Sequence, residues 1–293
     1  MALAVRASVI VPVYADWKRL GLCLDALSAQ TLRSDEFEIL IVNNEAEPRR
    51  PLGPMPANAR LLHEPRPGSY SARNRAIEEA RGEFLAFTDS DCVPDPDWLN
   101  SALRRLERQP AARVTGPVRI FREPGGGRQA YLYDRFNAFQ QPLFVKLGYC
   151  VTANLVAPRS LFERVGRFNA EMMSGGDREW GLRATAAGVP LLFDENVIVG
   201  HPARASVGQI LSRKRRIAGA EALRKRDSTA KYVLVRLMPP GLGPIRNARR
   251  MAGARALSPL DAASLYLVNW AVRLSEAFEF LLVRLGAKGS NRA

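Results

Sequence analysis

Two aspartates, Asp89 and Asp91, stand one residue apart at the end of an apolar stretch, in the sequence FLAFTDSDCVPDPDW. Carboxylates this close repel each other, and a hard divalent cation with oxygen ligands relieves the repulsion while bridging to phosphate oxygens. The spacing therefore indicates a Mg2+ or Mn2+ site that takes a phosphorylated ligand. The alternative is an Asp-rich turn that caps the following helix, and this stretch alone supports both interpretations equally.

A second segment with suitable chemistry lies upstream, where a Gly-Ser turn opens a helix expected over residues 69–81. Arg73, Asn74 and Arg75 fall near its start, and a helix N-terminus that carries arginines suits a phosphate group. A solvated basic helix face is the commoner origin of such a pattern. The phosphate interpretation therefore depends on the neighbouring aspartate pair.

Two further candidates lie downstream. Asp177 falls in the first turn of a helix expected over residues 176–187, in the sequence MSGGDREWGLRATAAG. A carboxylate there can act as general base toward an acceptor hydroxyl, or it can simply cap the helix. His201, one of two histidines, follows an apparent strand at residues 197–200. It can complete a metal site or contact a phosphate, although a lone histidine more often has a structural role.

Short apolar runs that alternate with helical periodicity position these residues. The β-branched run SVIVPVY predicts a buried strand over residues 8–14, and a helix is expected over residues 16–30. The alternation continues through strands at 37–42, 60–63 and 83–88 and helices at 69–81 and from Asp97 onward. This pattern predicts an α/β fold with a mostly parallel central sheet flanked by helices.

Ligands of such sheets bind beyond the carboxyl ends of the strands, so the residues directly after each strand are candidates for the site. Polar side chains occupy these positions, namely Tyr14, Asn43, Asn44, Glu45, Asp89, Ser90 and Asp91. The sequence therefore predicts one polar, acidic edge of the sheet.

Beyond Arg113 the pattern is more irregular. Extended segments are expected at 114–121 and 149–157 and helices at 129–140 and 176–187, with no linker between the two halves. From Ser206 onward the chain is expected to be helical, with a break at the Pro- and Gly-rich residues 239–244. The last helix, over residues 259–285, is amphipathic, and its charged residues leave no run of the ~20 apolar residues that span a bilayer.

Composition limits the class of protein. A chain of 293 residues with 47% hydrophobic residues can bury a large core, which excludes disorder throughout. Its three cysteines lack metal-ligand spacing and are too few and too scattered for a disulfide framework. The first apolar run is interrupted by Pro12 and is too short for a signal peptide, so we expect a cytoplasmic protein with reduced thiols.

The formal charge of +14 is concentrated near the C-terminus. Residues 201–256 contain fourteen Lys and Arg against two acidic residues. The segment RKRRIAGAEALRKR at residues 213–226 has too few aromatic residues nearby for base stacking, and no nucleic-acid-binding motif accompanies it. A basic segment followed by an amphipathic helix predicts an anionic membrane surface as the partner, and no nucleic acid.

Taken together, these segments resemble the family 2 glycosyltransferases, which are inverting enzymes with the GT-A fold. The resemblance extends from residue 8 to about residue 201. It rests on the ordered motifs SVIVPVY, ARN, TDSD followed by PDPDWL, TANLVAPRSLFERVGRF and GGDREWGLR.

The resemblance implies roles for particular residues. Pro12, Tyr14, and Asn44 or Glu45 would hold the nucleoside of the donor, with Arg73, Asp89 and Ser90 also on the nucleotide sugar. The metal, Mn2+ or Mg2+, would be held by Asp91 and His201. Asp177 would be the catalytic base, and Asn154 and Trp180 would border the acceptor. The sequence departs from the family pattern at two places, with Asn43 and Asn44 where an acidic pair is usual and Gly176 where an acidic residue often precedes the base.

The expected function is therefore transfer of a sugar from a nucleotide-diphosphate sugar, with a UDP-sugar as first candidate, to a glycan or lipid-linked acceptor in cell-surface polysaccharide or glycolipid synthesis. Residues 1–205 would form the catalytic domain, divided into a nucleotide-sugar half at 1–112 and an acceptor half at 113–205. Residues 206–293 would form a helical extension that binds the inner face of the cell membrane.

Two alternatives remain open from the sequence. One is a transferase of the same fold with a soluble or protein-linked acceptor, whose basic tail joins copies of the chain into a homo-oligomer. The other is a nucleotidyltransferase, which would show a Gly-rich phosphate loop with a basic residue after the first strand. This chain instead has VPVYADWKRL there.

Overall fold

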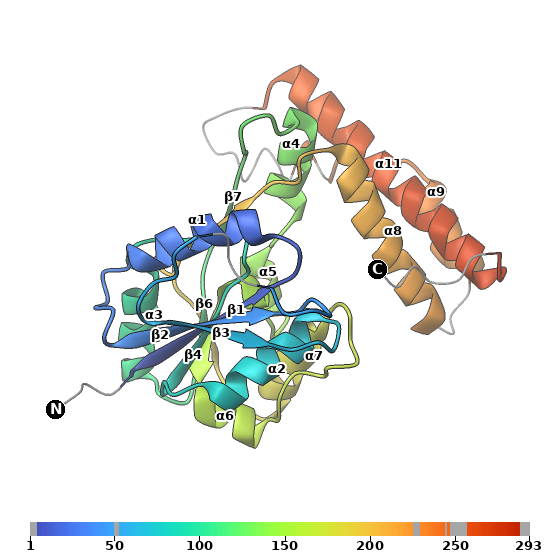
Figure 1. Cartoon of the computed structure of the whole chain (residues 1–293). Coiled ribbons are helices and arrows are strands. Elements are labelled where there is room, and N and C mark those ends of the chain that lie inside the picture. Colours follow the sequence, from blue (N-terminus) through green and yellow to red (C-terminus); the bar gives the residue numbers. More distant parts are fainter. Residues whose placement is uncertain (1–4, 50–52, 225–228, 244, 247–256, 288–293) are drawn as a thin grey trace. The chain divides into compact units, whose positions relative to one another are not determined.

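The computed structural model describes residues 5–49, 53–224, 229–243, 245–246 and 257–287. The chain forms two compact units (Figure 1). The first comprises Met1–Arg119 and Phe139–His201, and the second comprises Ile120–Ala138 and Pro202–Ala293.

A seven-stranded sheet forms the centre of the first unit, in the order β3-β2-β1-β4-β8-β6-β9. The strands are β1 (Ala7–Val13), β2 (Phe37–Asn43), β3 (Ala59–His63), β4 (Phe84–Phe87), β6 (Arg113–Thr115), β8 (Leu155–Pro158) and β9 (Leu191–Phe193). β1 pairs in parallel with β2 and β4, whereas β8 runs antiparallel to both β4 and β6. The prediction of a mostly parallel central sheet is confirmed.

Helices cover both faces of this sheet, as Figure 1 shows. They are α1 (Trp17–Ser28), α2 (Ser69–Glu79), α3 (Trp98–Arg108), α5 (Gln141–Lys146), α6 (Arg159–Arg164) and α7 (Gly176–Ala186). β1 is buried along its whole length and is apolar on both faces, as expected for a central parallel strand. Val9 and Val11 pack in one cluster with α1 and α3, and Ile10 packs in another with α2, α6 and α7. Because successive side chains of a strand point to opposite faces of the sheet, β1 contributes to a separate hydrophobic core on each face.

The strand expected over residues 114–121 is two strands. β6 ends at Thr115, and β7 (Val118–Phe121) joins a separate three-stranded sheet with β5 (Val93–Pro94) and β10 (Val199–Pro202). Pro117 has no N–H to donate to a ladder. Gly116 lies so close to neighbouring backbone that an added Cβ would be 2.2 Å from the carbonyl oxygen of Val197. The segment expected to be extended over 149–157 likewise contains a short 3-10 turn, η1 (Thr152–Asn154), before β8.

The second unit is helical, with α4 (Arg128–Asn137), α8 (Val207–Arg224), α9 (Thr229–Leu237) and α11 (Pro259–Arg284). Ala130 and Tyr133 of α4 pack with Ile210 of α8 and with Val268 and Val272 of α11. The compact units thus place α4, from the expected acceptor half, with the C-terminal helices. The domain boundary at residue 205 itself stays a prediction.

The amphipathic C-terminal helix expected from the sequence corresponds to α11. The Ser258 side chain accepts a hydrogen bond from the Asp261 N–H at its start, and Arg128 of α4 donates two hydrogen bonds of 2.7 and 2.6 Å to Asp261. None of the helices in the described part of the chain combines the length and apolar character needed to cross a bilayer.

Candidate active site

The carboxyl ends of β1, β2 and β4 meet at one edge of the sheet, because these strands are adjacent and parallel. Tyr14, directly after β1, is 70% exposed there. Glu45, shortly after β2, accepts hydrogen bonds from the Ala15 N–H at 3.0 Å and from the Trp17 indole at 2.6 Å. Glu45 therefore fixes the loop between β1 and α1, which includes Ala15 at a positive φ of 55°. Pro12, by contrast, is buried within β1.

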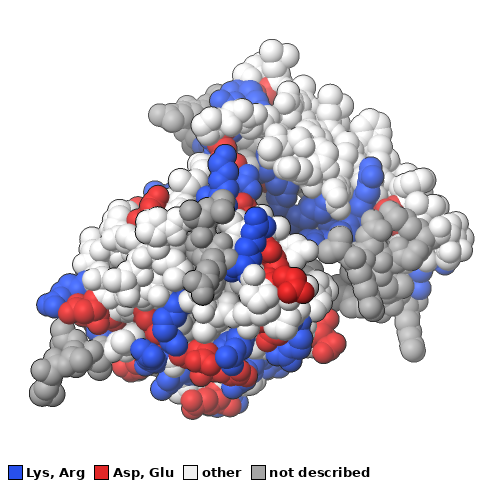
Figure 2. Space-filling view, in the orientation of Figure 1, with Lys and Arg blue, Asp and Glu red and all other residues white. Residues whose placement is uncertain are grey.

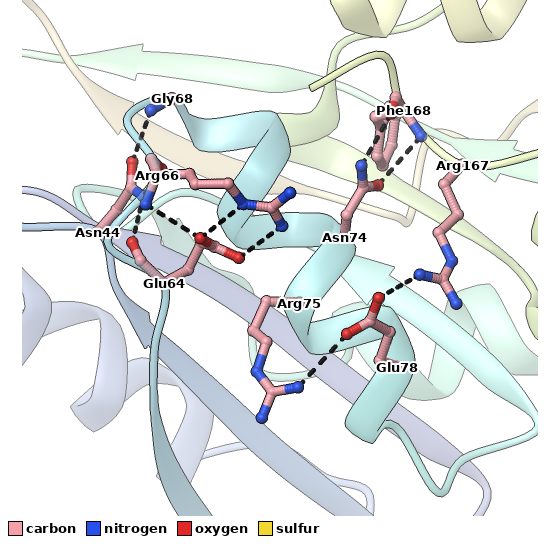
Figure 3. A network of polar contacts seen from close by, with 9 residues as sticks. All are labelled: Asn44, Glu64, Arg66, Gly68, Asn74, Arg75, Glu78, Arg167 and Phe168. Atoms are coloured by element: carbon pink, nitrogen blue, oxygen red, sulfur yellow. Dashed lines mark hydrogen bonds and ion pairs between the residues drawn. The ribbon is translucent and has the colours of Figure 1, made fainter. Parts of the chain in front are cut away.

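Asn44 has a positioning role (Figure 3). Its amide nitrogen donates to the carbonyls of Glu64 at 2.8 Å and Arg66 at 2.7 Å, and its oxygen accepts from the Gly68 N–H at 2.9 Å. Both amide donors are used and the side chain is buried. Asn44 thus holds the turn that starts α2, and this geometry does not support its predicted contact with a nucleoside.

Three consecutive polar residues of α2, Arg73, Asn74 and Arg75, point in different directions. The Asn74 amide bonds the backbone of Phe168, and Arg75 pairs with Glu78 (Figure 3). Arg73 alone faces the strand ends, where its Nη2 donates to Asp89 Oδ1 at 2.5 Å. Arg73 is 3% exposed. Its Nε is buried and has no hydrogen-bond partner in the described structure. A buried cation with a free donor beside Asp89 suits an anionic ligand group.

Asp91 and His201 come together from distant parts of the sequence. His201 Nε2 lies 3.5 Å from Asp91 Oδ2, and the His201 ring packs on Phe139 with centroids 4.6 Å apart. One ligand atom each from Asp91, Cys92 and His201 lie within 4.8 Å of one another. Burial raises the pKa of the Cys92 thiol well above its usual value. Its soft sulfur also suits Mg2+ or Mn2+ less well than oxygen and imidazole nitrogen do.

The remaining donors fit a divalent cation. Asp91 supplies a carboxylate and His201 a ring nitrogen, and both side chains are partly buried. Burial raises the pKa of the Asp91 carboxyl above its usual value. A bound cation opposes that effect, because it stabilises the ionised form. Ser90, between the two aspartates, is 9% exposed.

Asp177 lies in the first turn of α7, where the positive end of the helix favours a carboxylate. Its Oδ1 accepts hydrogen bonds from the Arg178 N–H at 2.8 Å and from the Tyr70 hydroxyl at 3.4 Å. Burial raises the pKa of the Asp177 carboxyl, while the Arg178 N–H and the nearby Arg73 cation lower it. A carboxylate with a raised pKa is a better proton acceptor near neutral pH.

Two predicted acceptor residues do not reach this edge. Trp180 is 1% exposed, stacks on Phe162 with centroids 4.5 Å apart, and donates its indole N–H to the Gly166 carbonyl at 2.8 Å. Asn154 is also buried; it accepts from the Trp98 indole at 2.9 Å and donates to the Val197 carbonyl at 2.8 Å. Both residues hold the core together, and their positions do not support roles in acceptor binding.

One residue of the site was missed from the sequence. Tyr70 lies one helical turn before Arg73 on α2 and contacts Asp177. No motif marks it. Its spacing of three residues from Arg73, which places both side chains on the same helix face, is the signal that could have identified it.

A mostly parallel sheet flanked by helices, with polar and acidic residues after adjacent parallel strands, is the arrangement of the GT-A fold of nucleotide-sugar transferases. The family model described as glycosyl transferase family 2 matches residues 8–166. The chain belongs to this family and is a glycosyltransferase.

Similar proteins agree with this assignment. The chain is 33% identical to glycosyltransferase AglE of Haloferax volcanii, over 92% of this chain and 93% of that protein. It is 30% identical to the succinoglycan biosynthesis protein ExoM of Rhizobium meliloti, over 64% of this chain and 67% of that protein. It spans less than half of several other relatives.

Among solved structures, the fold is similar to that of the mannosyltransferase PcManGT from Pyrobaculum calidifontis, which was determined in complex with GDP-Man and Mn2+. The TM-score is 0.58 at 20% identity, with 97% of this chain and 88% of that chain covered. At this level of identity the likeness establishes the GT-A fold.

Proposed function

We propose that this enzyme is an inverting, divalent-metal-dependent glycosyltransferase that moves a sugar from a nucleotide-diphosphate sugar, with a UDP-sugar as first candidate, to a glycan or lipid-linked acceptor. The observation that carries the proposal is the position of Asp177, whose partly buried carboxylate lies at a helix start close to the Arg73–Asp89 pair. The name of ExoM, a succinoglycan biosynthesis protein, supports a role in polysaccharide or glycolipid synthesis.

The chemical step is a single displacement. Asp177 accepts the proton of the acceptor hydroxyl, and the hydroxyl oxygen forms a bond to the anomeric carbon. The bond from that carbon to the phosphate oxygen breaks, and its electron pair leaves with the nucleoside diphosphate. Attack from the side opposite the leaving group inverts the anomeric configuration. Arg73, which is fixed to Asp89, places a cation at the edge where the donor's negative charge lies.

Asp91 and His201 are the residues that would hold Mn2+ or Mg2+. The ion would neutralise charge on the diphosphate as it departs. The two residues supply only part of a coordination shell, which leaves positions for ligand oxygens and water. Asp91 and His201 keep an oxygen donor and a nitrogen donor together at the edge of the sheet. The packing of the His201 ring on Phe139 helps to hold the imidazole in this position.

Calorimetric titration of UDP-, GDP- and dTDP-sugars, with and without Mn2+, tests the donor assignment. We expect one nucleotide class to bind, and to bind more tightly with the metal, because diphosphate charge must be neutralised at an acidic edge. Folded protein that binds none of these donors would contradict the proposal. Binding that is indifferent to Mn2+ would contradict its metal dependence alone.

The surface of the C-terminal unit is consistent with the proposal that the acceptor is bound to a membrane. Five apolar residues are exposed along one side of α11 and at the residue that directly follows it, at steps of seven and four residues. Three more are exposed on α9, which packs beside α11 through the rings of Tyr232 and Phe280. This apolar face comprises Leu260, Leu267, Leu274, Phe278, Leu285, Leu234, Val235 and Leu237.

Basic side chains accompany the apolar face. Arg215, Arg216 and Lys231 are exposed in the same unit. In Figure 2, Lys and Arg gather over α8, and a wide uncharged surface covers α11. Exposed apolar rows beside cations match a membrane that presents anionic headgroups above acyl chains. We therefore place the enzyme as a peripheral protein at the inner face of the cell membrane.

Serine at both Leu267 and Phe278 is expected to weaken binding to anionic vesicles by about 100-fold or more, because each buried side chain of this size contributes about 1.5–3 kcal/mol. Co-sedimentation with phosphatidylglycerol vesicles at low and high salt measures the effect. Leu22→Ser, at an exposed leucine of α1 in the other unit, is the control. Wild-type binding that is absent at low salt, or equal for neutral vesicles, would contradict the proposal. A dimer that the double variant dissociates would instead assign the face to contacts between copies of the chain.

A further inference from the structure

Tyr70 links the residues at the donor edge to Asp177. It is 6% exposed, and its hydroxyl lies 3.4 Å from Asp177 Oδ1. The Arg73 guanidinium lies 5.6 Å from the centroid of the Tyr70 ring, and the same guanidinium donates to Asp89. One tyrosine therefore contacts both Asp177 and the arginine that holds Asp89.

Gly176 leaves room for this tyrosine. A Cβ added at Gly176 would lie 2.8 to 2.9 Å from three atoms of the Tyr70 ring, closer than real side chains approach. The ring cannot readily move, because it also packs on Phe168 with centroids 5.7 Å apart. The glycine directly before Asp177 is therefore explained by the tyrosine that occupies the adjacent space. This is a steric requirement, since Gly176 is not among the glycines with a positive φ.

We propose that Tyr70 is a positioning residue for the transfer reaction: its hydroxyl orients the Asp177 carboxylate toward the acceptor hydroxyl, and Gly176 supplies the space that this arrangement needs. The proposal rests on Asp177 being the general base of the proposed function. A rotation of the carboxylate away from the acceptor would slow proton removal without disturbing the donor site.

The ionisation of Asp177 reports on this contact. The groups that face the carboxyl are Tyr70 and Arg73 from α2, Asp89 after β4, Tyr149 and Cys150 before η1, and Arg178 from its own helix. The Tyr70 hydroxyl stabilises the charged carboxylate and so lowers its pKa. Removal of the hydroxyl raises that pKa, and the loss of activity on acidification then occurs at a higher pH.

Tyr70→Phe tests the proposal with one atom removed. The assay measures release of nucleoside diphosphate from the donor that binds the wild type, with water as acceptor. We expect kcat to fall about 10-fold or more, as for loss of a hydrogen bond to a charged group, with donor KM unchanged. The acid limb of the pH profile should move to higher pH. Tyr133→Phe, at a buried tyrosine of α4, is the control and should change neither quantity.

Gly176→Ala tests the steric part. The added methyl group should displace the Tyr70 ring and lower kcat at least as much as Tyr70→Phe does. In a Tyr70→Ala background the space is free, so the same glycine change should have little further effect. Gly21→Ala in α1, where an added Cβ meets nothing within 4 Å, is the matched control. Gly176→Ala with wild-type kcat and an unshifted acid limb would overturn the steric argument.

Asp177→Asn in the same assay separates the two levels of inference. If Asp177→Asn is inactive while Tyr70→Phe matches the wild type in kcat and pH profile, the role of Tyr70 is wrong and the base assignment stands. If Asp177→Asn retains full turnover, the base assignment fails, and the role of Tyr70 fails with it.

Discussion

Asp177→Asn is expected to lower kcat by about 100- to 10,000-fold, the range typical of removing a general base. The amide has nearly the shape of the carboxylate but cannot accept the acceptor's proton. Donor binding should be unchanged, because the Arg73–Asp89 pair and the Asp91–His201 pair are untouched. Steady-state release of nucleoside diphosphate gives kcat, and calorimetry gives the donor affinity.

Glu179→Gln is the matched control for this experiment. Glu179 lies two residues further along the same helical turn and pairs with Arg183 at 2.6 Å, away from Tyr70. Its loss should cost little activity, since a partly exposed ion pair stabilises the fold only weakly. An Asp177→Asn variant that is as active as Glu179→Gln would refute the assignment of Asp177 as base.

Asp91→Asn is expected to weaken metal-dependent donor binding by about 100-fold or more, because even loss of an outer-sphere partner costs metal sites about 10- to 100-fold. The change removes one negative charge and leaves the shape of the side chain almost intact. The affinity should fall in the presence of Mn2+, and the difference between titrations with and without the ion should disappear. The calorimetric titration described above measures both quantities.

Asp95→Asn provides the comparison for Asp91→Asn. Asp95 lies four residues further along the chain, and its carboxylate accepts a hydrogen bond from the Asp97 N–H at the start of α3. Asp95→Asn therefore removes a negative charge from the same segment without removing a proposed metal ligand. It should leave the metal response intact. Equal metal responses in the wild type and in Asp91→Asn would show that Asp91 does not hold the cation.

The central strands of the first unit could be predicted because buried strands consist of short runs of apolar residues, which are visible in the local sequence. β1 and β2 lie between two helical layers, so nearly every position is apolar, and the strands are recognisable without any partner. β7 could not be separated from β6 in this way. Both are short and β-branched, and the break between them depends on the contacts of Gly116 with a loop about 80 residues away.

The candidate site was predicted in part for the same reason. Asp89 and Asp91 follow a recognisable strand, and Asp177 follows a recognisable helix start, so local signals located them. Asn44, Asn154 and Trp180 share the polar or aromatic character of ligand-binding residues. Their side chains instead satisfy buried backbone groups or fill the core, which depends on partners that are distant in sequence.

The sequence by itself determined the family, the parallel sheet, its acidic edge and the amphipathic basic C-terminus, because each depends on residue type and spacing over a few turns of chain. Only the tertiary structure decided which of the polar residues face the site. The contacts of Asp91 with His201, and of Tyr70 with Asp177, join residues more than 100 positions apart. Such contacts arise from the pairing of strands and the packing of helices, and no local pattern records them.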